Sequence, residues 1–162
     1  INVMLEMAEN NSRSHMSEFP VGTYKKAHRH GPGAHLLILS GDAGYSTLWT
    51  KDDRSDLRKA DWKVGGMVIV PGDDMFHQHF NASAQPARYF PVAFGSLRYP
   101  LTESKRRLFA GGDVSVKSGG DQIEWADQNP EIHRMFLDAL GNNGVESRMG
   151  KLIDESRYQA AE

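Results

Sequence analysis

Three of the seven histidines lie within residues 22–41, at spacings that could place them around one metal ion. His28 and His30 are two residues apart, so on a strand both side chains leave the same face. A turn of glycine and proline follows at residues 31–33, and His35 then opens the apolar run LLILS, which predicts a buried strand. Two neighbouring strands would therefore present three imidazoles to one point.

A second stretch, residues 65–81, combines an apolar run, a turn and then His77 and His79 at strand spacing. One of these two histidines could supply a fourth ligand. Neutral imidazole is the commonest protein ligand for zinc, copper, iron and nickel, and the absence of cysteine argues against a structural zinc site. The two stretches together indicate a metal site held in β-structure.

The spacing of these residues resembles the two sequence motifs of the cupin family. The first motif is matched at Gly22, His28, His30, position 35 and Gly41. The second motif is matched at Gly65, Pro71, His77 and Asn81. Each match departs from the family spacing by one residue, which a turn tolerates well. The resemblance covers residues 22–94 and implies an all-β fold, the cupin double-stranded β-helix or jelly-roll barrel; to this we add a C-terminal α-helix.

His35 stands where most cupins carry a glutamate, so the resemblance implies a metal held by four histidines: His28, His30, His35 and His77. The exchange removes one negative charge from the site. The metal would then be more electrophilic, and softer ions would be favoured over hard, oxygen-preferring ions such as Mg²⁺. By resemblance to cupin dioxygenases, Fe(II) is the favoured cofactor, with Mn, Ni, Co or Zn as alternatives.

Three further residues are candidates for catalytic roles: His79, Tyr24 and Lys26. His79 shares a strand face with His77, which suits a hydrogen-bond partner of a ligand, a proton-transfer residue or a substitute ligand. Tyr24 and Lys26 share the parity of His28, so on an unbroken strand they would face the barrel interior. A lysine there could anchor a substrate carboxylate; the alternative is that its charged end reaches the rim of the barrel.

The other two histidines, His15 and His133, have no partner in the sequence pattern and are interpreted as ordinary surface or interface residues. Further strands are predicted within residues 1–9, 15–19, 45–49, 62–64, 67–70 and 88–96. Pro91 would demote part of the last strand to an edge or a bulge. Residues 51–59 are strongly charged and predict a solvated loop.

The clearest helix signal lies near the C-terminus. Asn129 is a good N-cap, Pro130 suits the first turn, and Gly141 is expected to end the helix. The apolar stripe of this helix predicts core packing or a subunit contact; it comprises Ile132, Met135, Phe136, Ala139 and Leu140. A shorter helix is predicted for residues 101–109, and residues 142–162 are expected to fray.

These signals divide the chain into three parts. Residues 1–21 form N-terminal strands that could serve as a dimer arm, residues 22–97 form the cupin barrel with the metal site, and residues 98–162 form an extension with helices. A homodimer is expected, because an open edge strand tends to find a partner. The chain begins at Ile1 within a strand-like stretch. Since many cupins carry two such domains in tandem, one expectation is that it is the second half of a two-cupin protein.

Composition limits the class of partner. The 162 residues suit one domain, and the net charge of -2 argues against a basic surface for nucleic acid or an anionic membrane. The sequence has no long apolar run, no signal-peptide pattern and no cysteine. A cytoplasmic protein that acts on a small molecule is the resulting expectation, with no nucleic acid and no membrane as partner.

The resemblance to cupin dioxygenases makes a metal-dependent enzyme, an Fe(II) dioxygenase that acts on a small organic substrate, the first hypothesis. A non-oxidative reaction is the second, such as decarboxylation, another lyase reaction or isomerisation, with the metal as Lewis acid. The third is a module that binds a small ligand without catalysis, because a fold does not determine a function.

Overall fold

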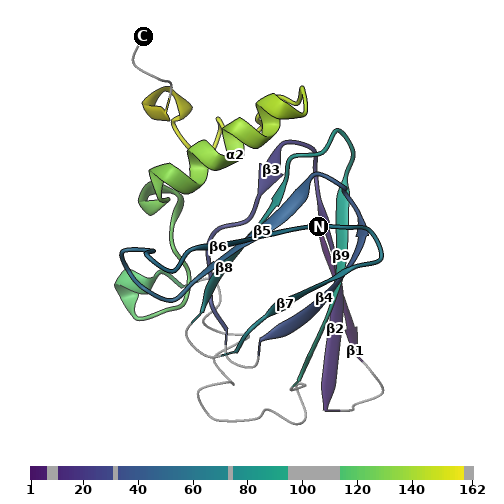
Figure 1. Cartoon of the computed structure of the whole chain (residues 1–162). Helices are drawn as coiled ribbons and strands as arrows, with labels where there is room; N and C mark the ends of the chain where they lie inside the picture. Colours follow the sequence, from purple (N-terminus) through teal and green to yellow (C-terminus); the bar gives the residue numbers. More distant parts are fainter. Residues whose placement is uncertain (7–10, 31–32, 73–74, 95–113, 159–162) are drawn as a thin grey trace.

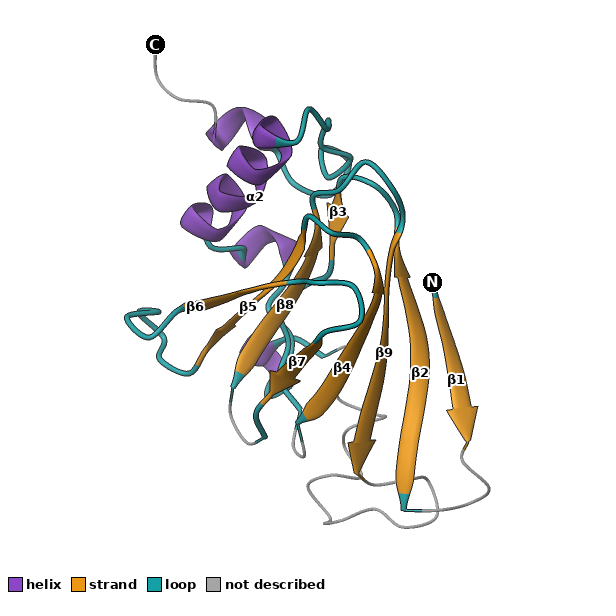
Figure 2. Ribbon diagram, turned by 45° about the vertical axis from the view of Figure 1, so that its right-hand side comes forward, coloured by secondary structure: helices purple, strands orange, loops and turns teal. Residues whose placement is uncertain are grey.

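The computed structural model describes residues 1–6, 11–30, 33–72, 75–94 and 114–158. Within these residues the chain forms two antiparallel sheets that face each other (Figures 1 and 2). The five-stranded sheet has the order β1 (Asn2–Glu6), β2 (Ser12–Phe19), β9 (Ala87–Phe94), β4 (Ala34–Ser40) and β7 (Met67–Val70). The four-stranded sheet has the order β3 (Thr23–Tyr24), β8 (Phe76–Asn81), β5 (Gly44–Trp49) and β6 (Arg58–Asp61). The predicted all-β jelly roll is confirmed.

Alternate residues of the strands fill the space between the two sheets. In β4, Leu36 and Ile38 are buried, whereas Leu37 and Leu39 are exposed. One core cluster takes residues from both sheets and from the loop after β6, among them Phe19, Leu48, Trp62, Val68 and Tyr89. The period of two in the side-chain directions therefore produces a two-layer structure around a shared apolar core.

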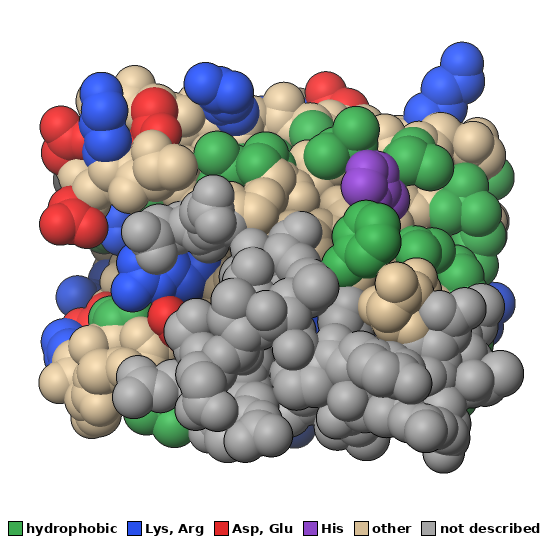
Figure 3. Space-filling view, turned by 90° about the horizontal axis from the view of Figure 1, so that it is seen from below, with side chains coloured by type: hydrophobic (Ala, Val, Ile, Leu, Met, Phe, Trp, Pro, Cys, Tyr) green, Lys and Arg blue, Asp and Glu red, His purple; other side chains and the backbone are tan. Residues whose placement is uncertain are grey.

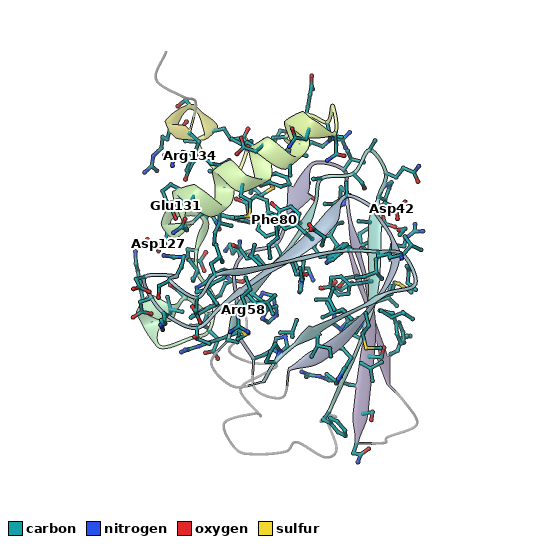
Figure 4. The ribbon with its side chains drawn as sticks, viewed as in Figure 1. Asp42, Arg58, Phe80, Asp127, Glu131 and Arg134 are labelled. Atoms are coloured by element: carbon teal, nitrogen blue, oxygen red, sulfur yellow. The ribbon has the colours of Figure 1, made fainter. Side chains whose placement is uncertain are left out.

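The four-stranded sheet is covered on its outer face as well. Every residue of β5 and β8 is buried, because helix α2 (Pro130–Asn142) lies across this sheet (Figures 1 and 4). The ring of Phe80 in β8 lies 5.8 Å from that of Phe136 in α2. The Asn129 side chain accepts hydrogen bonds from the backbone N–H groups of Glu131 and Ile132. The predicted helix and its cap are confirmed, and its apolar stripe packs in the core.

The segment after α2 also packs against this sheet, so the expectation that residues 142–162 fray is wrong for the described part. Met149, Ile153 and Tyr158 are buried in the cluster beneath α2. Three short 3₁₀ helices complete the described structure: η1 (Val116–Ser118), η2 (Trp125–Asp127) and η3 (Glu155–Tyr158). The predicted helix at residues 101–109 lies outside the described residues.

Pro91 lies in a central strand, so its predicted place at an edge or bulge is wrong. Strand β9 pairs with β2 on one side and with β4 on the other. The β2–β9 register is interrupted between the pairs Ser14↔Val92 and Ser17↔Tyr89, where Pro91 has no N–H to donate. The Ser14 hydroxyl donates to the Pro91 carbonyl at 2.9 Å. A local gap in the ladder, with a side chain bonded across it, thus accommodates the proline.

Two segment boundaries in the structure differ from those predicted from the sequence. The charged loop predicted at residues 51–59 ends in β6, and residues 62–64 lie in the turn that follows. Residues 1–21, predicted as an arm, place β1 and β2 in the chain's own five-stranded sheet, with β1 at its edge. None of the helices in the described ranges is both long and apolar enough to cross a membrane.

Candidate metal centre

Three histidines from two segments meet at one point. His28, His30 and His77 each offer a ring nitrogen, and these nitrogens all lie within 4.8 Å of one another. The ring centroids of His28 and His77 are 4.3 Å apart, and those of His30 and His77 are 4.8 Å apart. We call these three residues the histidine triad.

Backbone pairing brings the two segments together. His28 and His77 form an isolated antiparallel bridge in which each N–H donates to the other's carbonyl, at 3.1 and 2.9 Å. The ring nitrogen Nδ1 of His28 lies 3.1 Å from the Lys26 carbonyl oxygen. Nδ1 of His77 lies 3.4 Å from the Met75 carbonyl oxygen. These contacts orient both rings toward the point where the triad meets.

The donor set fits a transition metal. Nδ1 of His30 is buried and has no hydrogen-bond partner in the described structure, which a bound metal or its ligands would explain. Burial, and after it the charge of His28, lowers the pKa of His30 to about 3. Burial also lowers the pKa of His77 well below its usual value. Both imidazoles are therefore neutral at pH 7, the form that binds Fe, Mn, Co, Ni or Zn.

The structure does not bring His35 to this triad, which corrects the predicted four-histidine set. His35 lies on the outer face of β4, exposed, and is paired with Ile69 of β7 and Val92 of β9. The inward positions of β4 belong to its neighbours Ala34 and Leu36. Because adjacent residues of a strand point to opposite faces, His35 cannot turn inward while these two fill the core.

His79 lies beside the triad without joining it. Its ring centroid is 5.2 Å from that of His77, and its side chain is only 2% exposed. Its Nδ1 lies 2.8 Å from the Ser46 hydroxyl oxygen, which also accepts the Trp62 indole N–H at 2.9 Å. The indole N–H can only donate, so the hydrogen of the Ser46 hydroxyl is accepted by Nδ1 of His79 among the described contacts. A ring whose Nδ1 accepts carries its hydrogen on Nε2, so this contact favours the Nε2–H form of His79.

The parity argument for Tyr24 and Lys26 does not hold, because an extra residue interrupts the strand, but both residues line the cavity that the triad also lines. Tyr24 pairs with Phe80, and His28 pairs with His77, so four steps on one segment oppose three on the other. Such a β-bulge reverses the parity of the side chains on either side of it. The face on which His28 lies therefore does not show which face the residues before the bulge occupy.

Tyr24 consequently belongs to the core beneath α2. Its ring lies 4.8 Å from those of Phe80 and Phe136. Its hydroxyl lies 2.8 Å from Nδ1 of His133. His133 itself is fully buried, which corrects its interpretation as a surface or interface residue. Lys26 forms an ion pair with Glu124.

Lys25, which we did not predict from the sequence, also faces this cavity. Its ammonium Nζ lies 3.3 Å from the Ser17 hydroxyl and 3.4 Å from the Tyr89 hydroxyl. It also lies 5.1 Å from the centroid of the Phe19 ring. The alternation of the sequence gave no signal for this residue, because the bulge is set by pairing with β8.

The triad and Lys25 line one cavity of about 800 Å³, a volume typical of small-molecule sites. His15 and Arg13 line it too, so the interpretation of His15 as a surface or interface residue is corrected. Burial, and then the charge of Lys25, lowers the pKa of His15 to about 4. The positions of Arg13 and His15 could have been predicted from the sequence, because Arg13, His15 and Ser17 alternate along β2 and so share one face of the strand.

No protein-family model matches the sequence, and no curated protein matches it. Solved structures do resemble it in three dimensions. An oxalate decarboxylase aligns over 58% of this chain and 25% of its own, at 16% identity and a TM-score of 0.51. An oxalate oxidase in complex with glycolate aligns over 59% of this chain and 50% of its own, at 16% identity and a TM-score of 0.50.

A cupin 2 conserved barrel domain protein from Rhodopseudomonas palustris aligns over 59% of this chain and 60% of its own, at 17% identity and a TM-score of 0.48. The chain thus spans less than two thirds of each of these three proteins. At such identities the likeness concerns the fold. The two facing sheets and the likeness to the oxalate decarboxylase and the oxalate oxidase show that the chain has a cupin-type fold, with a histidine triad that could hold a metal ion.

Proposed function

We propose that this chain is a metal-dependent enzyme of the Fe(II) dioxygenase type that acts on a small organic substrate. The observation that carries the proposal is the histidine triad at the wall of a cavity of about 800 Å³. A purely structural metal site is closed by protein ligands, whereas a catalytic one keeps positions open. When bound, Fe(II) would supply redox chemistry with O₂, which requires such open positions.

The donor set supports a redox metal of intermediate softness. Among the described residues the triad is made of neutral nitrogen ligands, and no carboxylate joins it. Mg²⁺ and Ca²⁺ prefer oxygen ligands, so this set disfavours them. Fe(II) remains our first choice, and Mn, Ni, Co and Zn remain alternatives that the same nitrogens could hold.

His79 is the residue best placed to hold or move a proton near the triad. Burial is the largest cause that lowers its pKa, so the ring is neutral at pH 7. The Ser46 hydroxyl at Nδ1 fixes the orientation of the ring. Its Nε2–H form could donate a hydrogen bond to a substrate oxygen, and in the other tautomer Nε2 could accept a proton from the substrate. The neighbouring aromatic residues Trp62 and Tyr89 are 3% exposed each and would keep water away from this side of the cavity.

Metal analysis and oxygen uptake test the proposal together. Protein purified without an affinity tag is analysed for its metal content, then loaded with Fe(II) under anaerobic conditions and mixed with O₂ and a panel of small hydroxy acids, diketones and catechols. We expect one iron per chain and O₂ uptake that depends on one substrate. Zinc-loaded protein and the His30→Ala variant are the matched controls, and both should be silent.

The alternatives predict other outcomes. Oxidation and decarboxylation of oxalate are the activities that the names of the two neighbours describe. Substrate turnover without O₂ uptake would replace the dioxygenase with a non-oxidative reaction such as decarboxylation. Saturable binding of a ligand without turnover, for every metal, would make the chain a binding module.

The proposal also covers the oligomeric state, the location and the partner of the chain. A homodimer in the cytoplasm is the expected form, on the grounds of the open edge of β1 and the lack of cysteine. A small molecule is the expected partner, and neither nucleic acid nor a membrane is.

A further inference from the structure

The cavity beside the histidine triad carries a cation with no acidic partner among the described residues. The ammonium of Lys25 contacts the Ser17 hydroxyl at 3.3 Å and the Tyr89 hydroxyl at 3.4 Å. A third contact joins it to Oδ1 of Asn2 at 3.4 Å. All three acceptors are neutral, and the distances exceed the usual 2.7–3.2 Å range for such bonds. These contacts hold the side chain in place but do not neutralise its charge.

Acidic groups near the cavity are already engaged. Among the described residues that line it, Asp121 is the acidic one, and it pairs with Arg29 at 3.0 Å. Glu124 pairs with Lys26. A half-buried ammonium without a counter-ion is costly, so this arrangement favours an anion supplied from outside.

Lys25 lies next to residues that adjoin the triad. Its backbone N–H donates to the carbonyl of His79, the neighbour of the triad on β8, at 3.2 Å. Its Nζ lies 5.7 Å from the centroid of the Tyr89 ring, and that centroid lies 4.9 Å from the centroid of His79. Lys25 and the triad line one cavity, and His79 and Tyr89 line it as well.

We propose that Lys25 binds the carboxylate of the substrate, so that the substrates of this site are small carboxylic acids with a second oxygen group directed at the histidine triad. The inference rests on the proposed function for the identity of the site, since it concerns the same cavity. An ammonium–carboxylate bond is charge-assisted and stronger than the neutral contacts that it would replace. The faces of Phe19 and Tyr89 tolerate the cation and exclude water around it.

The test compares two probes that differ in charge. Glycolate and glycolamide have nearly the same size, and only glycolate is an anion. Each is titrated by calorimetry into full-length protein loaded with zinc, which cannot support oxygen chemistry. We expect wild type to bind glycolate more tightly than glycolamide. In Lys25→Gln the ratio of the two affinities should fall by about tenfold or more, with the zinc content unchanged.

Two variants separate the role of Lys25 from a loss of folding or of overall charge. Lys25→Arg keeps the positive charge and should preserve most of the preference for glycolate. Lys59→Gln removes an exposed cation of β6 that pairs with Asp61, and the affinity ratio should stay at the wild-type value. An unchanged ratio in Lys25→Gln, or no saturable binding of glycolate by wild type, would overturn the proposal.

The outcome is independent of the oxygen chemistry. If Fe(II)-loaded protein takes up no O₂ while zinc-loaded protein keeps a Lys25-dependent preference for glycolate, the dioxygenase proposal fails and the carboxylate site stands. If O₂ uptake occurs but the protein binds glycolate and glycolamide equally well, the dioxygenase proposal stands and the carboxylate site fails.

Discussion

The histidines of this chain divide by the face that each residue occupies. His28, His30 and His77 direct ring nitrogens to one point, and His79 stands beside them, bonded to a buried hydroxyl. His35 has the same chemistry but lies on the solvent side of β4. The spacing of residue types was therefore less informative than the direction of each side chain.

The first prediction concerns the ligands. His30→Ala should weaken zinc or Fe(II) binding by more than about 100-fold, because even the loss of a group behind a ligand commonly costs 10–100-fold. His35→Ala is the matched control and should bind metal as wild type does. Elemental analysis after dialysis measures both. Loss of metal from the His35 variant, or full occupancy in the His30 variant, would contradict the assignment.

His79 should affect turnover more than metal content. The variant His79→Gln should keep at least most of the bound metal, while any activity falls by about 10²–10⁴-fold, the usual range for a lost proton-transfer group. Metal analysis and turnover are measured on the same preparation. A metal-free product would instead make His79 a ligand.

The stability of the metal-free protein should depend on pH. Burial lowers the pKa of His30 to about 3 and places those of His77 and His79 well below the usual value. The unfolded chain, with ordinary histidine pKa values near 6.5, then binds protons that the folded chain does not. Stability should be complete above about pH 7 and should fall on acidification, by about 1.4 kcal/mol per pH unit for each such histidine.

Urea denaturation in a chelating buffer at about pH 7.5 and about pH 5 measures this dependence. The His79→Gln variant should lose stability less steeply than wild type, because one titrating group is gone. Equal midpoints at the two pH values would show that these histidines are not buried as described.

At the scale of elements, the four-stranded sheet depends on its helix. Helix α2 carries Ile132, Phe136 and Leu140 onto the outer face of β5 and β8, and the cap at Asn129 begins the helix at the right residue. Figure 4 shows Arg134 and Glu131 on α2, with Phe80 between the helix and the sheet. Because β8 also holds His77, packing beneath the helix supports the metal centre from behind.

Removal of one helix residue should show this dependence. Phe136→Ala should lower the free energy of unfolding by about 3–5 kcal/mol, the range for a fully buried phenylalanine. Arg134→Ala, on the exposed side of the same helix, should change it by less than about 0.5 kcal/mol. Chemical denaturation compares the two, and similar losses would argue against the packing described.

At the scale of the molecule, the five-stranded sheet leaves an apolar outer face. Met67 and Ile69 of β7 are 60% and 58% exposed, and Val92 and Phe94 of β9 are 44% and 56% exposed. Figure 3 shows hydrophobic side chains gathered around a histidine on one side of the lower face of the molecule. Contiguous patches of this kind are uncommon on monomers and often mark an interface.

The homodimer expected from the sequence remains a prediction, and this face is where we expect the second copy to pack. Sedimentation should show a dimer whose dissociation constant rises at least about tenfold in Ile69→Lys. Leu152→Lys, at an exposed leucine on the C-terminal segment, is the control and should leave the association unchanged. A wild-type chain that sediments as a monomer at high concentration would contradict the prediction.

Much of this architecture follows from local sequence. Several features depend only on neighbours a few residues away: the cap and the apolar stripe of α2, and the bounds of β7. The two-residue spacing of His28 and His30, and of His77 and His79, is local in the same sense. Periodicity and capping are local properties, so a sequence reader can obtain them without knowing which strands meet.

Other features were decided by contacts between distant segments. Residues 36–39 are all apolar, so their pattern could not show which face would meet the core. That face was set by the pairing of β4 with β7 and β9. The bulge opposite β8 brought Lys25 into contact with Ser17 and Tyr89, which the parity of the sequence did not predict. Parity along a strand is a local property, but register between strands is not. The sequence by itself therefore determined which residues could bind a metal, and the tertiary structure decided which of them meet, because the face that a strand turns to the core is set by its pairing with distant strands.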